Sequence, residues 1–380
     1  MSKASELANL IGNINAGGGG VNRNVIINGA MNVAQRGTSS TSAGFSTVDR
    51  FKSGVQTIGI TQSQESLSSG EPFEKGFTKF YRQTVTSPST ATNVIMEVKH
   101  SIEAQNIANS GWDFKNPNRP LSLSFYARSS VAGTYYSYIR NTDASPAQYY
   151  RFSFVLSANT WTKVEKTIAG NSNLVFPTDN GEGLAIFWVP AFGTNYSGSS
   201  VNLNQWETIT GSDYIPDITH AWGNTNGATF DLTGVQLEVG QNPTEFEHEK
   251  FSQTLEKCSR YYQKTKADSD SYKHFGLWFC AADTGGGGTG YGTVAIPLVT
   301  TMRTIPSLET TGTVGNYSIL AKNVNYALTT FSVDTGIDDG TINGQFYLNA
   351  YSAGGMGVGT AGAVRANNTS VAFVALDAEL

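Results

Sequence analysis

Alternation of apolar and polar residues with a period of two is the feature of this sequence that most restricts its fold. It is clearest in Leu121–Arg128, where the odd-numbered residues are apolar and the even-numbered residues are Ser, Ser, Tyr and Arg. Residues 134–140 and 150–156 alternate in the same way. One apolar and one polar face on each strand is typical of an antiparallel sandwich. The pattern therefore predicts a mainly β protein built around an antiparallel β-sandwich.

Length and composition agree with this prediction. A chain of 380 residues is long enough for two β domains, each with its own core. Only 14% of the residues are charged, against about a quarter in ordinary globular proteins. The 41 glycines and the aromatic fraction of 11% indicate strands joined by many turns. The net charge of -5 and the lack of a basic run exclude a nucleic-acid partner.

Neither membrane insertion nor cysteine chemistry is indicated. No window approaches the roughly 20 apolar residues of a membrane span, and the N-terminus lacks the apolar core of a signal peptide. We therefore expect synthesis in the cytoplasm of the producing cell. Cys258 and Cys280 do not form a CxxC pair or a zinc-binding set. Buried, reduced thiols are favoured, and a disulfide between the two is the alternative.

The N-terminus combines a short apolar stripe with a flexible link. Leu7, Leu10, Ile11 and Ile14 recur at helical spacing, and Gly17–Gly20 follows. A helix this short is not stable alone in water. It is either a frayed terminus or, as we favour, a docking peptide for a neighbouring subunit.

One helix interrupts the β pattern after the sandwich. Thr244 and Glu247 have capping-box spacing, so the helix is expected to open near Pro243. Its apolar stripe consists of Phe251, Leu255, Cys258 and Tyr262. The predicted layout is an attachment segment at 1–20, a β-sandwich domain at 21–245, which the resemblance described below implies to be a jelly roll, a connector helix at 246–264 and a smaller β tip domain at 265–380.

Catalytic patterns are not found. The four histidines occur singly, there is no G-x-S-x-G elbow, and the glycines at 285–290 lack the strand and helix of a nucleotide site. Asp113, Asp231 and Glu238 are candidate carboxylates for glycoside cleavage, but solvated or capping roles are the default for such residues. We therefore expect no enzymatic activity, no catalytic residues and no cofactor.

Three blocks carry a resemblance to a known family. The first is Asn22–Gly37 with Val48–Phe51, and the second is Phe230–Gly240 followed by Pro243–Glu247 and the Cys-Ser-Arg-Tyr-Tyr-Gln run at 258–263. The third and weakest is Gly292–Pro297 with Met302–Pro306. Together they resemble bacteriophage tail fibre or receptor-binding proteins that contain a jelly-roll module like a carbohydrate-binding module.

The resemblance implies a non-enzymatic virion protein of the tail fibre. Such a protein would be a homotrimer that docks on other tail proteins through residues 1–20 and adheres to bacterial surface polysaccharide or lipopolysaccharide. Aromatic rings stack on sugar C–H faces while polar groups bond hydroxyls. The candidate contacts on strands expected to be half exposed are Tyr126, Tyr136, Tyr138, Arg140 and Trp188.

Three further points stay open from the sequence. Modules of this kind sometimes hold a structural calcium ion, for which Asp49 and Asp231 lie in suitable segments. A purely structural role in a tail or as a capsid decoration is an alternative function. A glycan-degrading tailspike enzyme is another, less favoured one.

Overall fold

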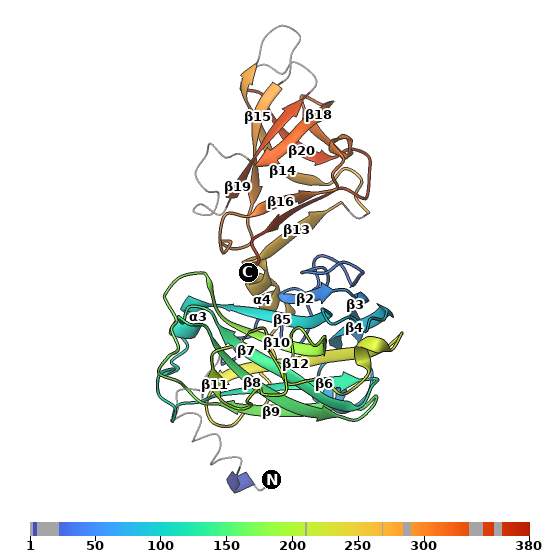
Figure 1. Cartoon of the computed structure of the whole chain (residues 1–380). Coiled ribbons are helices and arrows are strands. Elements are labelled where there is room, and N and C mark those ends of the chain that lie inside the picture. Colours follow the sequence, from blue (N-terminus) through green and yellow to red (C-terminus); the bar gives the residue numbers. More distant parts are fainter. Residues whose placement is uncertain are drawn as a thin grey trace. The chain divides into compact units, whose positions relative to one another are not determined.

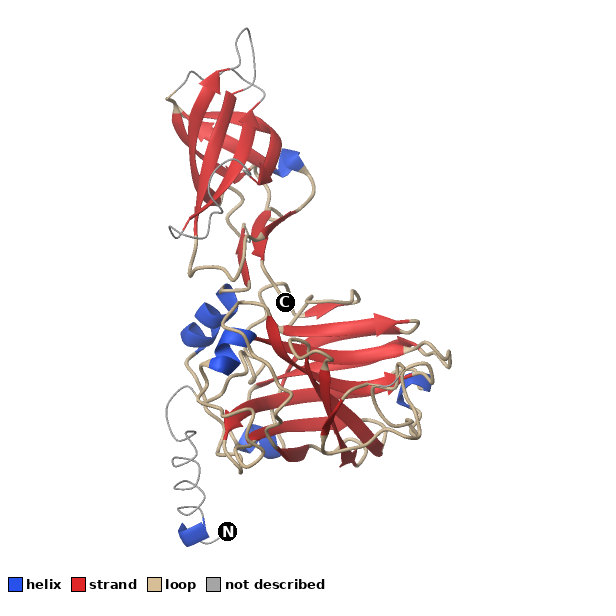
Figure 2. Ribbon diagram, turned by 60° about the vertical axis from the view of Figure 1, so that its left-hand side comes forward, coloured by secondary structure: helices blue, strands red, loops and turns tan. Residues whose placement is uncertain are grey.

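The chain forms two compact units, which meet between Thr254 and Leu255. The computed structural model describes residues 3–5, 23–209, 211–267, 269–283, 290–333, 345–352 and 359–380. Both units consist mainly of antiparallel β-strands (Figures 1 and 2), which confirms the predicted mainly β class. Apart from a helical turn at residues 3–5, the predicted attachment segment lies outside the described residues. None of the helices in the described ranges is long and apolar enough to span a membrane.

The first unit is a sandwich of two six-stranded sheets in the described part of the chain. In spatial order, sheet A contains β1 (Ser39–Ser40), β3 (Gly59–Ser66), β4 (Lys79–Ser87), β12 (Thr229–Val239), β6 (Leu121–Ser129) and β9 (Thr162–Ile168). Sheet B contains β11 (Trp206–Glu207), β8 (Gln148–Leu156), β7 (Gly133–Asn141), β10 (Glu182–Phe192), β5 (Ile95–Glu103) and β2 (Phe51–Gln56). The chain crosses repeatedly between the sheets, as in a jelly roll. Short helical elements are α2 (Glu71–Glu74), α3 (Ala104–Ala108) and η1 (Trp222–Asn224).

Alternating apolar residues of both sheets form the core between them. The odd-numbered residues 121–127 of β6 are at most 2% exposed, as the sequence pattern predicts. Phe125 lies edge-on to Phe154 of β8 and Trp188 of β10, with ring centroids 5.4 and 5.7 Å away. Burial of such apolar area at about 25 cal/mol per Å² is the main force that joins the two sheets.

The even-numbered residues of β6 are buried as well, although the pattern predicts a wet face. Ser122, Ser124 and Tyr126 are 0, 5 and 4% exposed. Tyr126 contacts a small apolar cluster that includes Phe77 and Phe246. The outer face of sheet A is therefore partly covered by segments that are distant in the sequence.

The first of the three blocks that carry the family resemblance meets the second in this unit, and the two blocks hold its two ends together. The amide of Asn24 donates to the Glu247 carboxylate at 3.0 Å, and the Asn24 side chain bonds Val235 and Leu237 of β12. The Arg23 guanidinium lies 3.4 Å from the buried Glu238 carboxylate. Within the described residues, these motifs therefore have a structural role.

The connector helix is shorter than predicted and starts later. Helix α4 covers Phe251–Ser259, and residues 241–250 are not helical. Thr244 donates its hydroxyl to Glu238 at 2.8 Å, and Glu247 accepts from Asn24, so the predicted capping box does not form. The expected start at Pro243 is wrong because Glu238, six residues earlier in the chain, and Asn24, far from it in sequence, engage the two polar side chains. Tyr262, placed in the helix from sequence, begins the next strand.

The second unit contains a three-stranded sheet and a closed barrel. The sheet consists of β13 (Tyr262–Lys266), β21 (Phe373–Asp377) and β16 (Ser307–Thr310). The barrel consists of β14 (His274–Asp283), β15 (Gly290–Pro297), β19 (Gln345–Ser352), β18 (Val324–Val333), β17 (Tyr317–Ala321) and β20 (Ala361–Ala366), with η2 at Val314–Asn316. Trp278 fills the interior and donates its indole N–H to the Ala350 carbonyl at 3.2 Å. A second, smaller β region is thus present, and its independent folding stays a prediction.

Candidate functional site

Three of the predicted contacts, Tyr136, Tyr138 and Arg140, project from the same face of β7. Tyr138 stacks on Phe187 of β10, with centroids 4.3 Å apart and planes within 10°. Tyr214, from the segment between β10 and β12, lies over the Tyr138 ring, with ring centroids 5.7 Å apart. Tyr138 is consequently only 3% exposed, so the expectation of a half-exposed ring is wrong for this residue. The chain's own loop covers much of the face that a ligand was expected to use.

Arg140 is half-buried and belongs to an ion-pair network. Its guanidinium and the Lys99 ammonium lie 2.7 and 2.5 Å from the two carboxylate oxygens of Glu182, which also accepts from Ser101. Burial by itself would raise the pKa of Glu182, but Lys99 and these hydrogen bonds lower it to about 2. Burial raises the pKa of Glu97 on β5, and this effect outweighs the lowering of that pKa by a hydrogen bond from Tyr138. The ligand roles of Tyr136 and Arg140 stay predictions.

The other two predicted contacts lie in different places. Trp188 is 0% exposed in the core between the sheets, so its expected half exposure is wrong. Period-two alternation fails as a guide there because both faces of β10 are buried. Tyr126 lies on sheet A, away from β7, and lines a small separate pocket.

Two of the three candidate acids are buried and engaged by neighbouring groups. Arg82 and Arg128 bind the two oxygens of the fully buried Asp231 at 2.7 Å each. Glu238 is 0% exposed and accepts from Thr244 and Gln236. Asp113 lies exposed on a loop.

Asp49 and Asp231, the two residues suggested for a structural calcium ion, both accept hydrogen bonds from neighbouring side chains. Both carboxylate oxygens of Asp49 accept hydrogen bonds from Gln35, at 2.9 and 2.6 Å. Those of Asp231 are taken by two arginines. Across the ranges that the structure describes, no group of three His, Cys, Asp or Glu side chains has metal-binding geometry. The structural calcium ion stays a prediction.

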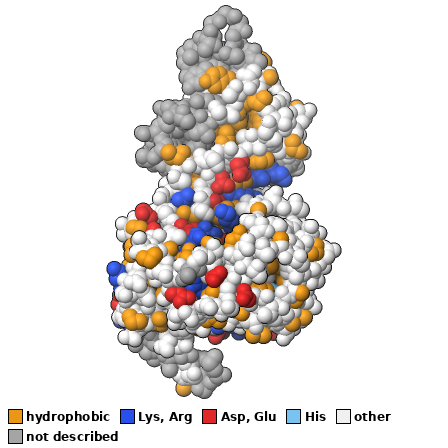
Figure 3. Space-filling model, in the orientation of Figure 1, with side chains coloured by type: hydrophobic (Ala, Val, Ile, Leu, Met, Phe, Trp, Pro, Cys, Tyr) orange, Lys and Arg blue, Asp and Glu red, His pale blue; other side chains and the backbone are white. Residues whose placement is uncertain are grey.

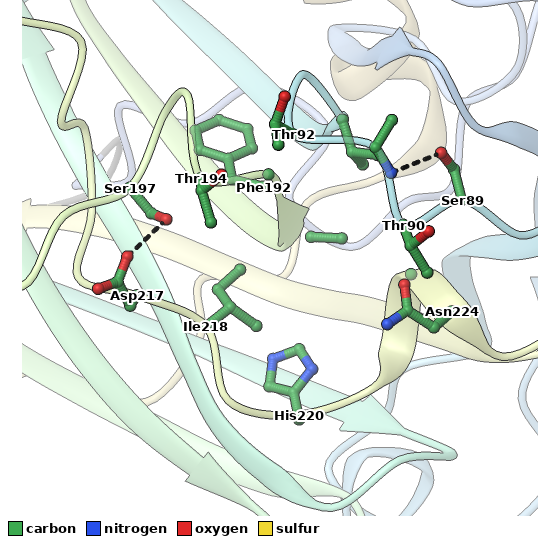
Figure 4. Close-up of a pocket in the computed structure, with 15 residues that line it drawn as sticks. Ser89, Thr90, Thr92, Phe192, Thr194, Ser197, Asp217, Ile218, His220 and Asn224 are labelled. Atoms are coloured by element: carbon green, nitrogen blue, oxygen red, sulfur yellow. Dashed lines mark hydrogen bonds between the residues drawn. The ribbon is translucent and has the colours of Figure 1, made fainter.

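A cavity lies where three loops of the first unit meet. Its volume is about 300 Å³, at the lower end for small-molecule sites. We call it the Phe192 cavity. It is lined by Ser89, Thr90, Ala91, Thr92, Val94, Ala191, Phe192, Gly193, Thr194, Ser197, Asp217, Ile218, His220, Gly223 and Asn224. Figure 4 shows hydroxyl and amide side chains arranged around the open space, with Phe192 and Ile218 between them.

Backbone hydrogen bonds position these loops. Gly193 donates to the Val94 carbonyl at 2.8 Å, and Ser89 donates to the Gly223 carbonyl at 3.0 Å. A side chain at Gly193 would run into the backbone carbonyls of Ala91 and Thr92. The absence of a Cβ at this position therefore permits the close approach that shapes the cavity.

The cavity presents one carboxylate and one neutral imidazole. Ser197 donates its hydroxyl to Asp217 at 2.9 Å (Figure 4). Burial lowers the pKa of His220 to about 4, so the ring is neutral at pH 7. Its Nδ1 accepts weakly from the Trp222 amide at 3.4 Å, which places the proton on Nε2. This Nε2 has no partner among the described residues and is a hydrogen-bond donor close to the cavity.

This lining suits the recognition of a polyhydroxyl ligand. Hydroxyls and an amide both donate and accept, and the Phe192 ring offers an apolar face. Asp217 is the one acid in the described lining, whereas glycoside hydrolysis requires a pair. On the face drawn in Figure 3, charged side chains cover only a small part of the described surface. The arrangement can bind a ligand by hydrogen bonds.

Sequence reasoning did not identify this cavity. Its residues come from three separate segments, at positions 89–94, 191–197 and 217–224, and none of them shows a local pattern that indicates a binding site. The turn cluster at 194–200 is the one local signal, and it indicates a loop without indicating a site.

The fold and site thus define a β-sandwich protein with a hydrogen-bonding cavity formed by three loops of the sandwich. No family model matches the chain, and no curated protein matches it. Solved structures with similar shape include the enzymatically active domain of tailspike protein 4 of bacteriophage CBA120, at 10% identity and a TM-score of 0.31 over 57% of this chain. The match spans 21% of that tailspike chain.

Two smaller proteins are matched over most of their length. A xylan-binding domain from Paenibacillus barcinonensis has 9% identity and a TM-score of 0.26, covering 53% of this chain and 93% of its own. A family 30 carbohydrate-binding module has 9% identity and a TM-score of 0.27, covering 58% of this chain and 91% of its own. Scores this low carry no argument about what this chain does.

Proposed function

We propose that this chain is a non-catalytic adhesive protein of a bacteriophage tail fibre, which binds sugar units of a bacterial surface glycan. The observation that carries the proposal is the Phe192 cavity, which combines hydroxyl, amide and aromatic groups with a single acid. The sequence blocks at 22–51 and 230–263 support the assignment to a tail fibre through their resemblance to that family.

A shallow site of this kind suffices when several copies act together. Linked binding sites raise avidity by about 100- to 10,000-fold without new contacts. The proposal therefore includes a homotrimer that is fixed to other tail proteins through residues 1–20. Light scattering of the full chain at micromolar concentration tests the assembly, and a monomer mass would contradict it.

A glycan array probed with the full chain tests the adhesive function. We expect binding to a subset of bacterial surface polysaccharides or lipopolysaccharides and no release of reducing sugar. Phe192→Ala is expected to weaken binding at least about tenfold, because it removes a stacking contact. Phe73→Ala is the matched control, since Phe73 is 43% exposed and does not line the cavity.

The alternatives give different results. A purely structural virion protein would show no glycan binding, although deletion of residues 1–20 would still prevent its incorporation into particles. A tailspike enzyme would release reducing sugar from the host polysaccharide. Under the proposed function, the same deletion abolishes incorporation and leaves glycan binding by the soluble protein intact.

A further inference from the structure

A second pocket lies on sheet A of the same unit, formed by different strands and loops. Its volume is about 120 Å³, and we call it the Phe246 pocket. It is lined by Lys75, Phe77, Ser124, Phe125, Tyr126, Lys163, Gly234, Thr244, Glu245, Phe246 and His248. None of these residues lines the Phe192 cavity. The space is too small for the larger ligands that pockets of 300 Å³ and above accept.

An irregularity in β12 keeps the pocket open. The pairing of β12 with β6 shifts between Thr233 and Gln236, and Gly234 within the shift has a φ of 63°. A Cβ at Gly234 would lie 2.8 Å from Cζ of Phe77 and 3.1 Å from Cδ2 of Tyr126. Glycine therefore serves both the left-handed backbone and the free space between the two rings.

Aromatic rings form the walls of the pocket. Phe77 meets Phe246 edge-on at 4.8 Å and Tyr126 edge-on at 5.9 Å, and the His248 ring lies 5.0 Å from Phe77. Phe77 and Tyr126 are 1 and 4% exposed. The Tyr126 hydroxyl donates to Glu71 at 3.1 Å, so its polar end has a partner outside the lining. The interior thus favours a small group with an apolar face.

Two ammonium groups lie beside these rings. The side chains of Lys75 and Lys163 are 48 and 34% exposed, and they pair with Glu245 at 3.6 Å and with Glu165 at 2.7 Å. Exposed pairs of this kind exchange partners at little cost, because each contributes about 0–1 kcal/mol. Either ammonium is therefore available to donate to an acceptor atom on a bound group.

We propose that the Phe246 pocket binds the acetyl group of an N-acetylated amino sugar. The methyl group contacts the faces and edges of Phe77, Tyr126 and Phe246, and the amide carbonyl oxygen accepts from the Lys163 ammonium. The sugar ring itself stays outside, as the volume requires. Like the proposed function, this inference takes a glycan as the ligand. It places the binding site in a pocket on sheet A that is separate from the Phe192 cavity and has its own specificity.

Saturation-transfer NMR on the full chain tests the pocket, with N-acetylglucosamine, glucosamine and glucose as probes. We expect transfer to the acetyl methyl protons and affinity for N-acetylglucosamine at least about tenfold higher than for glucosamine. Phe246→Ala should weaken this binding by at least about tenfold. Lys163→Met should weaken it by about fivefold and serves as the second variant, because Lys163 lies in an exposed pair whose loss leaves the fold intact.

Phe192→Ala is the cross-control, since it alters the other cavity. The proposed pocket is supported if saturation transfer to the acetyl methyl protons persists in Phe192→Ala and is lost in Phe246→Ala and Lys163→Met. This holds even when the array finds no ligand for the Phe192 cavity. Equal affinity for the acetylated and unacetylated sugars would overturn the inference. Unchanged saturation transfer to the acetyl methyl protons in folded Phe246→Ala or Lys163→Met protein would also overturn it.

Discussion

The imidazole of His220 stacks on the phenol ring of Tyr135, with ring centroids 4.0 Å apart and ring planes 25° apart. Tyr135 is fully buried between the sheets, and its hydroxyl donates to the Val131 carbonyl at 2.7 Å. The stack therefore fixes a loop of the Phe192 cavity to the core of the sandwich.

This stack predicts a loss of stability in mild acid. The pKa of His220 is lowered by burial to about 4 in the folded chain, below its unfolded value of about 6.5. The unfolded chain thus binds more protons between these pH values, so the stabilisation is complete above about pH 6.5 and falls as the pH approaches 4. Urea unfolding should show the wild type losing about 1–2 kcal/mol more than His220→Gln between pH 7 and 4.5. The same pH dependence in both proteins would refute this account.

Asp231 is expected to be essential for the stability of sheet A. Its buried carboxylate joins Arg82 of β4 and Arg128 of β6 across β12. Asp231→Asn should lower the free energy of unfolding by about 3–5 kcal/mol, because it leaves two partly buried cations without their counter-charge. Glu165→Gln, which removes an exposed pair, is the control and should change it by less than about 1 kcal/mol. Chemical denaturation measures both, and similar losses in the two variants would contradict the prediction.

Gly193 is expected to be intolerant of a side chain. Its Cβ would lie 2.7 Å from the Ala91 carbonyl oxygen and closer still to that of Thr92. Gly193→Ala should therefore destabilise the first unit by about 1–3 kcal/mol and weaken ligand binding at the Phe192 cavity. Gly315→Ala, where a Cβ meets nothing within 4 Å, should leave stability nearly unchanged. Calorimetry measures the stability of the two variants. Equal stability of both would contradict the prediction and would mean that loop 91–94 can move aside freely.

Neighbouring residues of β14 should differ sharply in their effect on the second unit. Trp278 is 0% exposed inside the barrel, whereas Leu277 is 62% exposed on its outside. Trp278→Ala should cost about 3–5 kcal/mol, because it leaves a large cavity and removes the hydrogen bond from the indole to the Ala350 carbonyl. Leu277→Ala should cost less than about 0.5 kcal/mol. Thermal unfolding followed by circular dichroism measures both, and comparable losses would argue against the barrel core.

Several features followed from local sequence alone. Alternation in Leu121–Arg128 identified both the strand and its core-facing residues, because side chains of a strand point to opposite faces. The same rule applied to residues 134–140 placed Tyr136, Tyr138 and Arg140 on one face. Low charge and abundant glycine indicated a turn-rich β protein. These inferences hold because they depend only on backbone geometry and composition.

Exposure and hydrogen-bond partners were decided by the tertiary structure. Tyr138 is buried because Tyr214, far along the chain, packs over it, and Thr244 does not cap a helix because Glu238 accepts its hydroxyl proton. The Phe192 cavity exists only where loops from β4, β10 and η1 meet. Period and composition fix which way a side chain points, whereas coverage depends on contacts between distant segments, which a local pattern does not encode.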